Sequence, residues 1–177
     1  QEGKNYTEIS QMGGGIAHTT SATRTTSKDE LFRLGYSRMR AALRSGTTHL
    51  EVKSGYGLDT TTELKLIEVG HRLGEIKHLP TTDCTWLGAH DVPSPLSMEE
   101  YVDELLSDQL PAVVEQGLAR SANVFCEPGW FSLEHSESLL TSSRASVLSL
   151  RMHIAEFSTG GGAELAAYLK VDTAAHS

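Results

Sequence analysis

The alternation of short apolar segments with amphipathic helical segments constrains the fold of this chain more than any other feature. Each apolar or β-branched run is followed by a loop containing glycine or proline, and then by a segment with helical spacing. This order is typical of βα units arranged around a parallel sheet. Strands are predicted near 48–53, 82–89, 123–127, 150–156 and 172–177, and helices at 27–45, 60–74, 97–117, 132–144 and 161–169.

Capping patterns support the predicted helix starts. Ser27 and Ser97 are each followed three residues later by a glutamate, Glu30 and Glu100, which is the pattern of a capping box. The glycine-rich segment QMGGGIAHTT at 11–20 is interpreted as a loop, since it lacks the spacing of a phosphate-binding motif and no strand precedes it.

The length of the chain limits how much of a barrel it can form. A complete (β/α)8 barrel needs about 250 residues, with a lower limit of about 200, and this chain has 177. Four strands and the beginning of a fifth are predicted, so the pattern ends before a barrel closes. The expected fold is therefore α/β, either one partial (β/α)8 TIM-like barrel over 1–177 or a smaller doubly wound sheet of five strands.

Composition excludes several classes of function. With 15 Lys and Arg against 23 Asp and Glu, the net charge is −8, and no basic cluster is present to neutralise phosphates, so nucleic acid is not expected as a partner. No apolar stretch approaches the roughly 20 residues that span a bilayer, and the first residues do not have the pattern of a signal peptide. We therefore expect a cytoplasmic protein with no membrane partner. Cys84 and Cys126 lie in apolar contexts and are expected to be buried, reduced thiols.

Polar side chains follow the predicted strands at the point where each strand ends. Because the carboxyl ends of parallel strands form the functional edge of βα folds, these side chains are expected to share one face. Taken singly, each histidine among them also fits a structural, hydrogen-bonded role. The set comprises Lys53, Ser54, Tyr56, His90, Glu127, His153, Glu156 and His176, and the first of these loops also contains Gly55 and Gly57.

Two of these residues suggest metal-assisted hydrolysis. Imidazole nitrogens and carboxylate oxygens are common ligands of Zn²⁺ and Fe²⁺, and such an ion activates water near neutral pH. A neighbouring carboxylate can then move a proton from water to a leaving nitrogen. His153 and Glu156 fit as ligand and proton shuttle.

An ordered series of motifs extends over essentially all 177 residues. The motifs are YTEI at 6–9, GGGI at 13–16, TR at 23–24, GTT at 46–48, E-x-KSGYGL at 51–58, ELK at 63–65, LGAH-x-VP at 87–93, VFCE at 124–127, H-x-x-E at 153–156 and GG-x-ELAA at 161–167. In this order they resemble the middle of the chain in the imidazolonepropionase family, which belongs to the amidohydrolase superfamily. KSGYGL and VFCE are the most specific of them.

The resemblance implies a distorted TIM barrel with one divalent metal ion, Zn²⁺ or Fe²⁺. It implies hydrolysis of the cyclic C–N bond of 4-imidazolone-5-propanoate to N-formimino-L-glutamate, a step of histidine breakdown. It also implies roles for six residues: His153 as a metal ligand, Glu156 and His176 as catalytic groups, and Tyr6, Tyr56 and His90 as substrate contacts.

The sequence also departs from the family pattern. The H-x-H metal ligands and a substrate-binding arginine of the family lie before residue 1, and its last metal-binding aspartate lies after residue 177, so the isolated chain is expected to be inactive. Ala155 and Ala175 stand where the family has acidic residues. Two alternatives stay open, namely another cyclic amidohydrolase or deaminase, and an inactive fragment that acts as a binding module. A homodimer is also open, because a partial barrel exposes sheet edges that favour association.

Overall fold

The computed structural model describes residues 15–176, with the side chain of Ala17 left out. The predicted alternation of strands and helices is confirmed over this range. The strands are β1 (His49–Lys53), β2 (Thr81–Ala89), β3 (Ser121–Cys126), β4 (Ser149–Ile154) and β5 (Thr173–Ala175). The helices are α2 (Ile16–Thr25), α3 (Lys28–Arg44), α4 (Thr60–Gly74), α5 (Met98–Glu104), the π-helical turn η1 (Leu105–Gln109), α6 (Leu110–Gln116), α7 (Leu133–Ala145) and α8 (Gly162–Leu169).

The five strands form one parallel sheet in the order β1-β2-β3-β4-β5. Neighbours in the sheet are therefore also neighbours in the sequence. A doubly wound sheet reverses its strand order at a switch point, and no such reversal occurs between residues 15 and 176. The doubly wound alternative is wrong, and the sheet is compatible with part of a TIM barrel.

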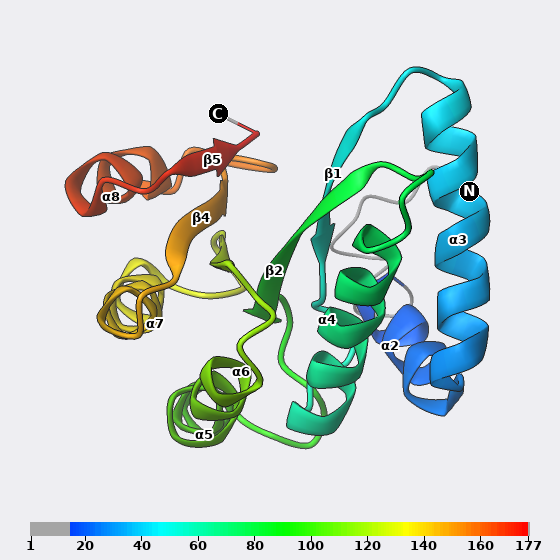
Figure 1. Cartoon of the computed structure of the whole chain (residues 1–177). Helices are drawn as coiled ribbons and strands as arrows, with labels where there is room; N and C mark the ends of the chain where they lie inside the picture. Colours follow the sequence, from blue (N-terminus) through cyan, green and yellow to red (C-terminus); the bar gives the residue numbers. More distant parts are fainter. Residues whose placement is uncertain (1–14, 177) are drawn as a thin grey trace, which may run out of the picture.

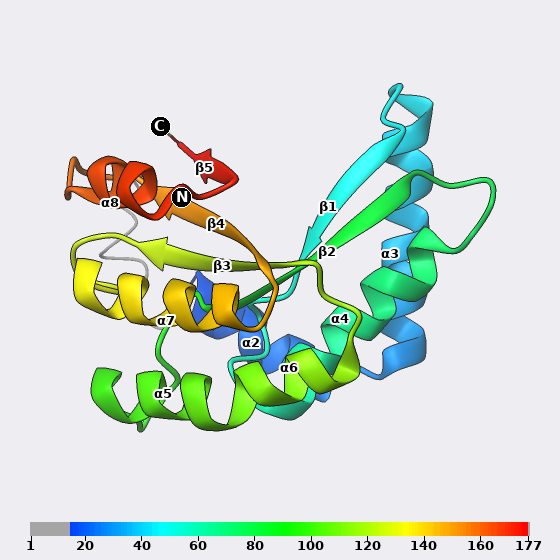
Figure 2. The same ribbon diagram turned by 60° about the vertical axis from the view of Figure 1, so that its left-hand side comes forward.

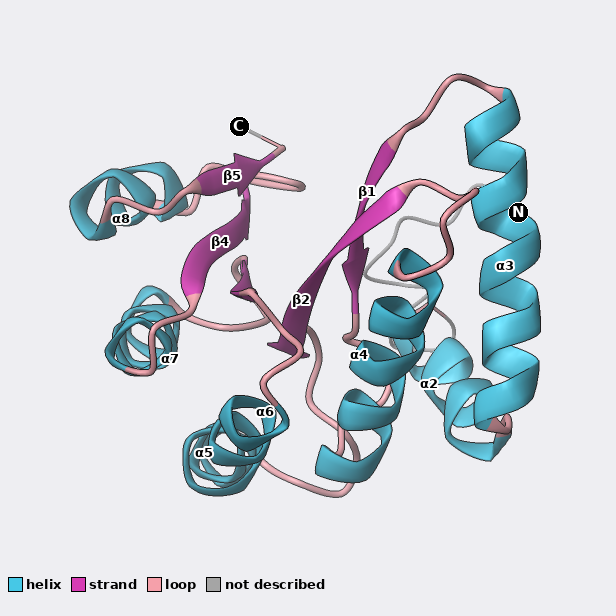
Figure 3. Cartoon of the chain, in the orientation of Figure 1, coloured by secondary structure: helices cyan, strands magenta, loops and turns pink. Residues whose placement is uncertain are grey.

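The sheet is curved, and the helices that connect its strands lie on the outside of the curve. Figures 1 and 3 show α4, α5, α6, α7 and α8 in an arc around the strands, with α3 outside α4. Figure 2 shows β3 between β2 and β4, with α5, α6 and α7 all on one side of them. The inner side of the curve is thus left without helices in the described part of the chain.

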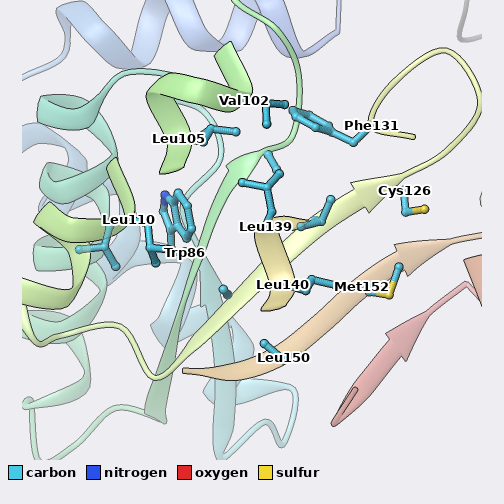
Figure 4. Packing of buried hydrophobic residues seen from close by; sticks show 14 of the residues in the cluster. Trp86, Val102, Leu105, Leu110, Cys126, Phe131, Leu139, Leu140, Leu150 and Met152 are labelled. Carbon is cyan, nitrogen blue, oxygen red and sulfur yellow. The ribbon is translucent and has the colours of Figure 1, made fainter. Parts of the chain in front are cut away.

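Alternation along the strands gives the two sides of the sheet different chemistry. Outward side chains join a core that contains Trp86, Leu139, Leu140, Leu150 and Met152 (Figure 4). Polar and charged side chains occupy most of the alternate, inward positions, and Phe125 is an apolar exception. Both cysteines are buried and free, as predicted. None of the helices between residues 15 and 176 is long and apolar enough to cross a membrane.

The interpretation of 11–20 as a loop is wrong from Ile16 onward, because residues 16–20 begin helix α2. Ile16 is buried in the main core, and Arg24 near the other end donates to the backbone carbonyls of Gly57 and Leu58. These tertiary contacts stabilise a segment rich in threonine and serine, whose intrinsic helix propensity is modest.

Of the two predicted capping boxes, one is complete and the other forms only one of its two hydrogen bonds. Ser97 and Glu100 form the reciprocal capping box. The Ser27 hydroxyl accepts from the Glu30 amide at 3.2 Å, but the Glu30 carboxylate pairs with Arg33. The predicted helix 97–117 is interrupted by the π-helical turn η1, which divides it into α5 and α6.

Candidate active site

Five ring side chains lie in a row across the carboxyl edge of the sheet, one from each strand or from the loop that follows it. The ring centroids are 5.1 Å apart for Tyr56 and His90, 6.0 Å for His90 and Phe125, 6.2 Å for Phe125 and His153, and 5.5 Å for His153 and His176. The expectation that strand-end residues share one face is therefore met for these positions. Sequence reasoning missed Phe125, although the alternation along VFCE indicates that its side chain points inward.

Three other predicted strand-end residues hold the backbone or pair with a neighbouring side chain. Lys53 lies 2.5 Å from the Glu51 carboxylate. The buried Ser54 hydroxyl accepts from the Leu87 amide at 2.9 Å. Glu127 is also buried, and it accepts from the Glu156 amide at 3.2 Å and from a serine hydroxyl at 2.7 Å. Glu127 therefore fixes the backbone of the loop that carries Glu156.

The His90 ring is held by the loop after β1. Its Nδ1 atom lies 2.7 Å from the carbonyl oxygen of Gly55, and because a carbonyl oxygen only accepts, Nδ1 carries the proton. Burial lowers the pKa of His90 below its ordinary value, although the hydrogen bond to Gly55 acts in the opposite direction. In a neutral ring that donates from Nδ1, the Nε2 lone pair can accept a hydrogen bond.

The His153 ring is fixed in the same tautomer by a side chain of β3. Its Nδ1 atom lies 2.9 Å from the amide oxygen of Asn123, so Nδ1 donates and Nε2 keeps its lone pair. Burial, together with the positive charge of Lys53, lowers the pKa of His153 to about 4. This is the form in which a histidine binds a metal ion, with its second nitrogen oriented by a hydrogen bond.

The donor set for a metal ion is incomplete within the described residues. Between residues 15 and 176, no three histidine, cysteine, aspartate or glutamate side chains come close enough to hold an ion. His153 fits as one such ligand, but the described residues do not by themselves form a set of three. Sequence reasoning also missed Asn123, because its role depends on the pairing of β3 with β4 and not on a motif.

Glu156 and His176 approach each other where β4 and β5 end. Their nearest side-chain atoms, Oε2 and Nε2, are 3.7 Å apart, and both side chains are partly exposed. A carboxylate and an imidazole at this separation can exchange a proton through one water or after a small movement. Tyr6, which was predicted to contact the substrate, lies outside the described residues.

A network of ion pairs lies on the inner side of the sheet, one layer of side chains below His153. Arg151 lies 2.5 Å from the Glu51 carboxylate and also pairs with Asp83. Thr85 donates to Glu51 at 2.7 Å. Burial by itself would raise the pKa of Glu51, but hydrogen bonds from Lys53, Thr85 and Arg151 outweigh it and lower the pKa to about 2. The network contains two positive and two negative side chains, and its ion pairs connect β1, β2 and β4.

The chain is similar along almost its whole length to curated imidazolonepropionases. It is 42% identical to the imidazolonepropionase of Shewanella sediminis and 41% identical to those of Shewanella frigidimarina and Shewanella oneidensis, in each case over 99% of this chain. The chain spans 43% of the length of each of these relatives. No protein-family model matches it. The resemblance seen in the motifs, to part of the family's sequence, is confirmed.

Proposed function

We propose that this chain, a homologue of part of the imidazolonepropionase sequence, contributes part of an active site that hydrolyses 4-imidazolone-5-propanoate. The observation that carries the proposal is the row of rings across the carboxyl edge, in which the four predicted residues Tyr56, His90, His153 and His176 lie together. The product would be N-formimino-L-glutamate, formed by opening the cyclic C–N bond. The small-molecule substrate would sit over this edge.

The fold would then be part of a (β/α)8 barrel of the metal-dependent amidohydrolase type, spanning residues 1–177. The consecutive order of five parallel strands supports this, because a barrel adds its strands in sequence order. The polar inner side of the sheet supports it too, since Glu51, Asp83 and Arg151 lie where a closed barrel would enclose them.

His153 would hold the divalent ion through Nε2, because Asn123 already occupies Nδ1. Zn²⁺ and Fe²⁺ both suit imidazole and carboxylate ligands. When bound, such an ion supplies a Lewis acid that polarises the carbonyl group and makes water more acidic.

The remaining steps belong to side chains of this chain. Glu156 takes a proton from the attacking water as the new C–O bond forms at the ring carbonyl, and delivers a proton to the ring nitrogen as the C–N bond breaks. His176, 3.7 Å from Glu156, assists this transfer. Tyr56 and His90 bind the substrate, and the free Nε2 lone pair of His90 suits it to accept from a ring N–H.

This proposal can be tested with a hybrid enzyme, in which the chain replaces the matching segment of the Shewanella sediminis imidazolonepropionase. We expect the hybrid to hydrolyse imidazolone propionate and not hydantoin, a five-membered cyclic amide without the propionate. A preference for hydantoin would favour another cyclic amidohydrolase. A folded, metal-loaded hybrid that binds imidazole propionate without turning over either compound would favour the inactive binding module.

A further inference from the structure

We propose that Glu63 is a positioning residue that fixes the loop at 54–58, and through it Tyr56 and His90, before any substrate binds. The anchoring of the loop is argued independently of the proposed function. Only the identity of the ligand that Tyr56 and His90 would bind rests on that function. Glu63 itself would touch neither the substrate nor the metal.

Glu63 is a fully buried carboxylate whose hydrogen bonds go to the loop after β1. It lies in the first turn of α4 with 0% of its surface exposed. It accepts from the amide of Gly55 at 3.1 and 2.9 Å, from Gly57 at 2.7 Å and from Leu58 at 3.0 Å. A buried carboxylate is costly unless it is hydrogen-bonded, so the loop and the carboxylate stabilise each other in this one arrangement.

Helix capping does not account for this carboxylate. Asp59 is the N-cap of α4, and its side chain accepts from the Thr62 amide at 2.7 Å. The Glu63 amide itself donates to the Asp59 carbonyl oxygen, as an ordinary first-turn helical bond. Asp59 therefore supplies the cap of this helix, and the Glu63 side chain is directed to the loop.

Two carbonyl groups of the loop backbone are held by a residue of α2. Arg24 donates to the carbonyl oxygens of Gly57 at 2.7 Å and Leu58 at 3.0 Å, and it pairs with Asp59 at 2.9 Å. Gly57 has no room for a side chain, because a Cβ atom there would lie 2.8 Å from the Glu63 amide nitrogen and 2.9 Å from Oε1. The close approach of backbone and carboxylate thus requires glycine at this position.

Gly55 links the carboxylate to the candidate site. Its amide donates to Glu63, and its carbonyl oxygen accepts from Nδ1 of His90. Tyr56 stands between the two anchored glycines with 38% of its surface exposed, and its ring meets that of His90 edge to face. A change at Glu63 is therefore passed to His90 through one residue, Gly55, and to Tyr56 through the two glycines that flank it.

Amide hydrogen exchange in the 177-residue chain tests the anchoring without any substrate. In Glu63→Gln an amide NH₂ replaces Oε2, the nearer acceptor of the Gly55 amide at 2.9 Å, and leaves only Oε1 at 3.1 Å. Exchange of the Gly55 amide should therefore speed up by roughly 10- to 100-fold. The matched control is Glu68→Gln on the same helix, where the partly exposed carboxylate pairs with Lys28, and it should leave the loop amides unchanged.

Two further readouts separate positioning from a general loss of stability. Exchange in the core strands β3 and β4 should not change in Glu63→Gln, and the ¹⁵N signals of His90 should show loss of the single Nδ1–H tautomer. Equal acceleration throughout the core, or an unchanged His90 spectrum, would overturn the proposal. If Glu63→Gln does not fold, hydrogen exchange in the unmodified chain still tests the proposal. Amides of Gly55, Gly57 and Leu58 that exchange without protection there would overturn it.

The hybrid enzyme shows whether the anchoring of the loop by Glu63 affects ligand binding. There, Glu63→Gln should lower the affinity for imidazole propionate about tenfold, and Glu68→Gln should not change it. Accelerated loop exchange with unchanged affinity would refute a role in positioning the binding residues. A hybrid with no turnover at all would refute the proposed function and leave the exchange result to decide on Glu63 alone.

Discussion

Nδ1 of His90 lies 2.7 Å from the carbonyl oxygen of Gly55, so the orientation and the tautomer of the ring are set by the neighbouring loop. Because burial lowers the pKa of His90 below its ordinary value of 6.5, the ring should be neutral at pH 7 and should carry its proton on Nδ1. Long-range ¹H–¹⁵N correlation spectra of the chain report both properties. A protonated ring at pH 7, or an Nε2–H tautomer, would contradict this arrangement.

Tyr56 and His90 should both contribute to substrate affinity. In the hybrid enzyme, Tyr56→Phe and His90→Ala should each weaken binding by about 1–3 kcal/mol, the usual penalty when a buried polar partner is left unmet. Calorimetric titration with imidazole propionate, beside imidazole itself, measures the loss and shows whether it depends on the propionate. Tyr168→Phe serves as the control, since Tyr168 is 73% exposed on α8. Unchanged affinity in both variants would mean that these residues only pack the loops.

The isolated 177-residue chain should bind Zn²⁺ or Fe²⁺ weakly and should hydrolyse imidazolone propionate at the background rate. The reason is that, among the described residues, His153 does not belong to any group of three side chains that could hold a metal ion. Elemental analysis of the purified chain measures the metal content. Tightly held metal in a one-to-one ratio would show that the ligand set has been misjudged.

The ion-pair network should make the stability of the chain depend on pH below 5. The folded pKa of Glu51 is about 2, against an ordinary value of 4.5, so its contribution is complete above about pH 4.5 and is lost as the pH falls from there toward 2. In urea unfolding at several pH values, the difference in unfolding free energy between the unmodified chain and Glu51→Gln should shrink as the pH falls. Glu137→Gln, at an exposed position on α7, controls for removing one carboxylate. A difference that stays constant from pH 6 to pH 3 would contradict the role of the network.

The order of the elements was predictable because it follows from local patterns. Apolar runs and helical spacing predicted the five strands, with ends that differ from the observed ones by no more than three residues. The partial barrel could be distinguished from a doubly wound sheet only after the strand order was known. Helix α2 was missed because contacts made by Ile16 and Arg24 with distant segments stabilise it.

The candidate site was predictable only to the extent that it lies at strand ends. The strand-end rule selected Tyr56, His90, His153 and His176, whose rings lie in one row with that of Phe125 between His90 and His153. It could not select the residues that orient these rings. Asn123 and Glu63 each form hydrogen bonds to a different element of the fold from their own. Such contacts depend on register and loop geometry, and they leave no local signal in the sequence.

Turnover by the hybrid enzyme with Glu156→Gln tests the proposed chemistry most directly. The substitution keeps the shape of the side chain but removes the base, so the rate of imidazolone propionate hydrolysis should fall by about 10²- to 10⁴-fold. Metal content and affinity for imidazole propionate should be retained, since Glu156 is assigned neither role. Near-normal turnover in a folded, metal-loaded Glu156→Gln hybrid would contradict the assignment of this edge of the sheet as the hydrolytic site.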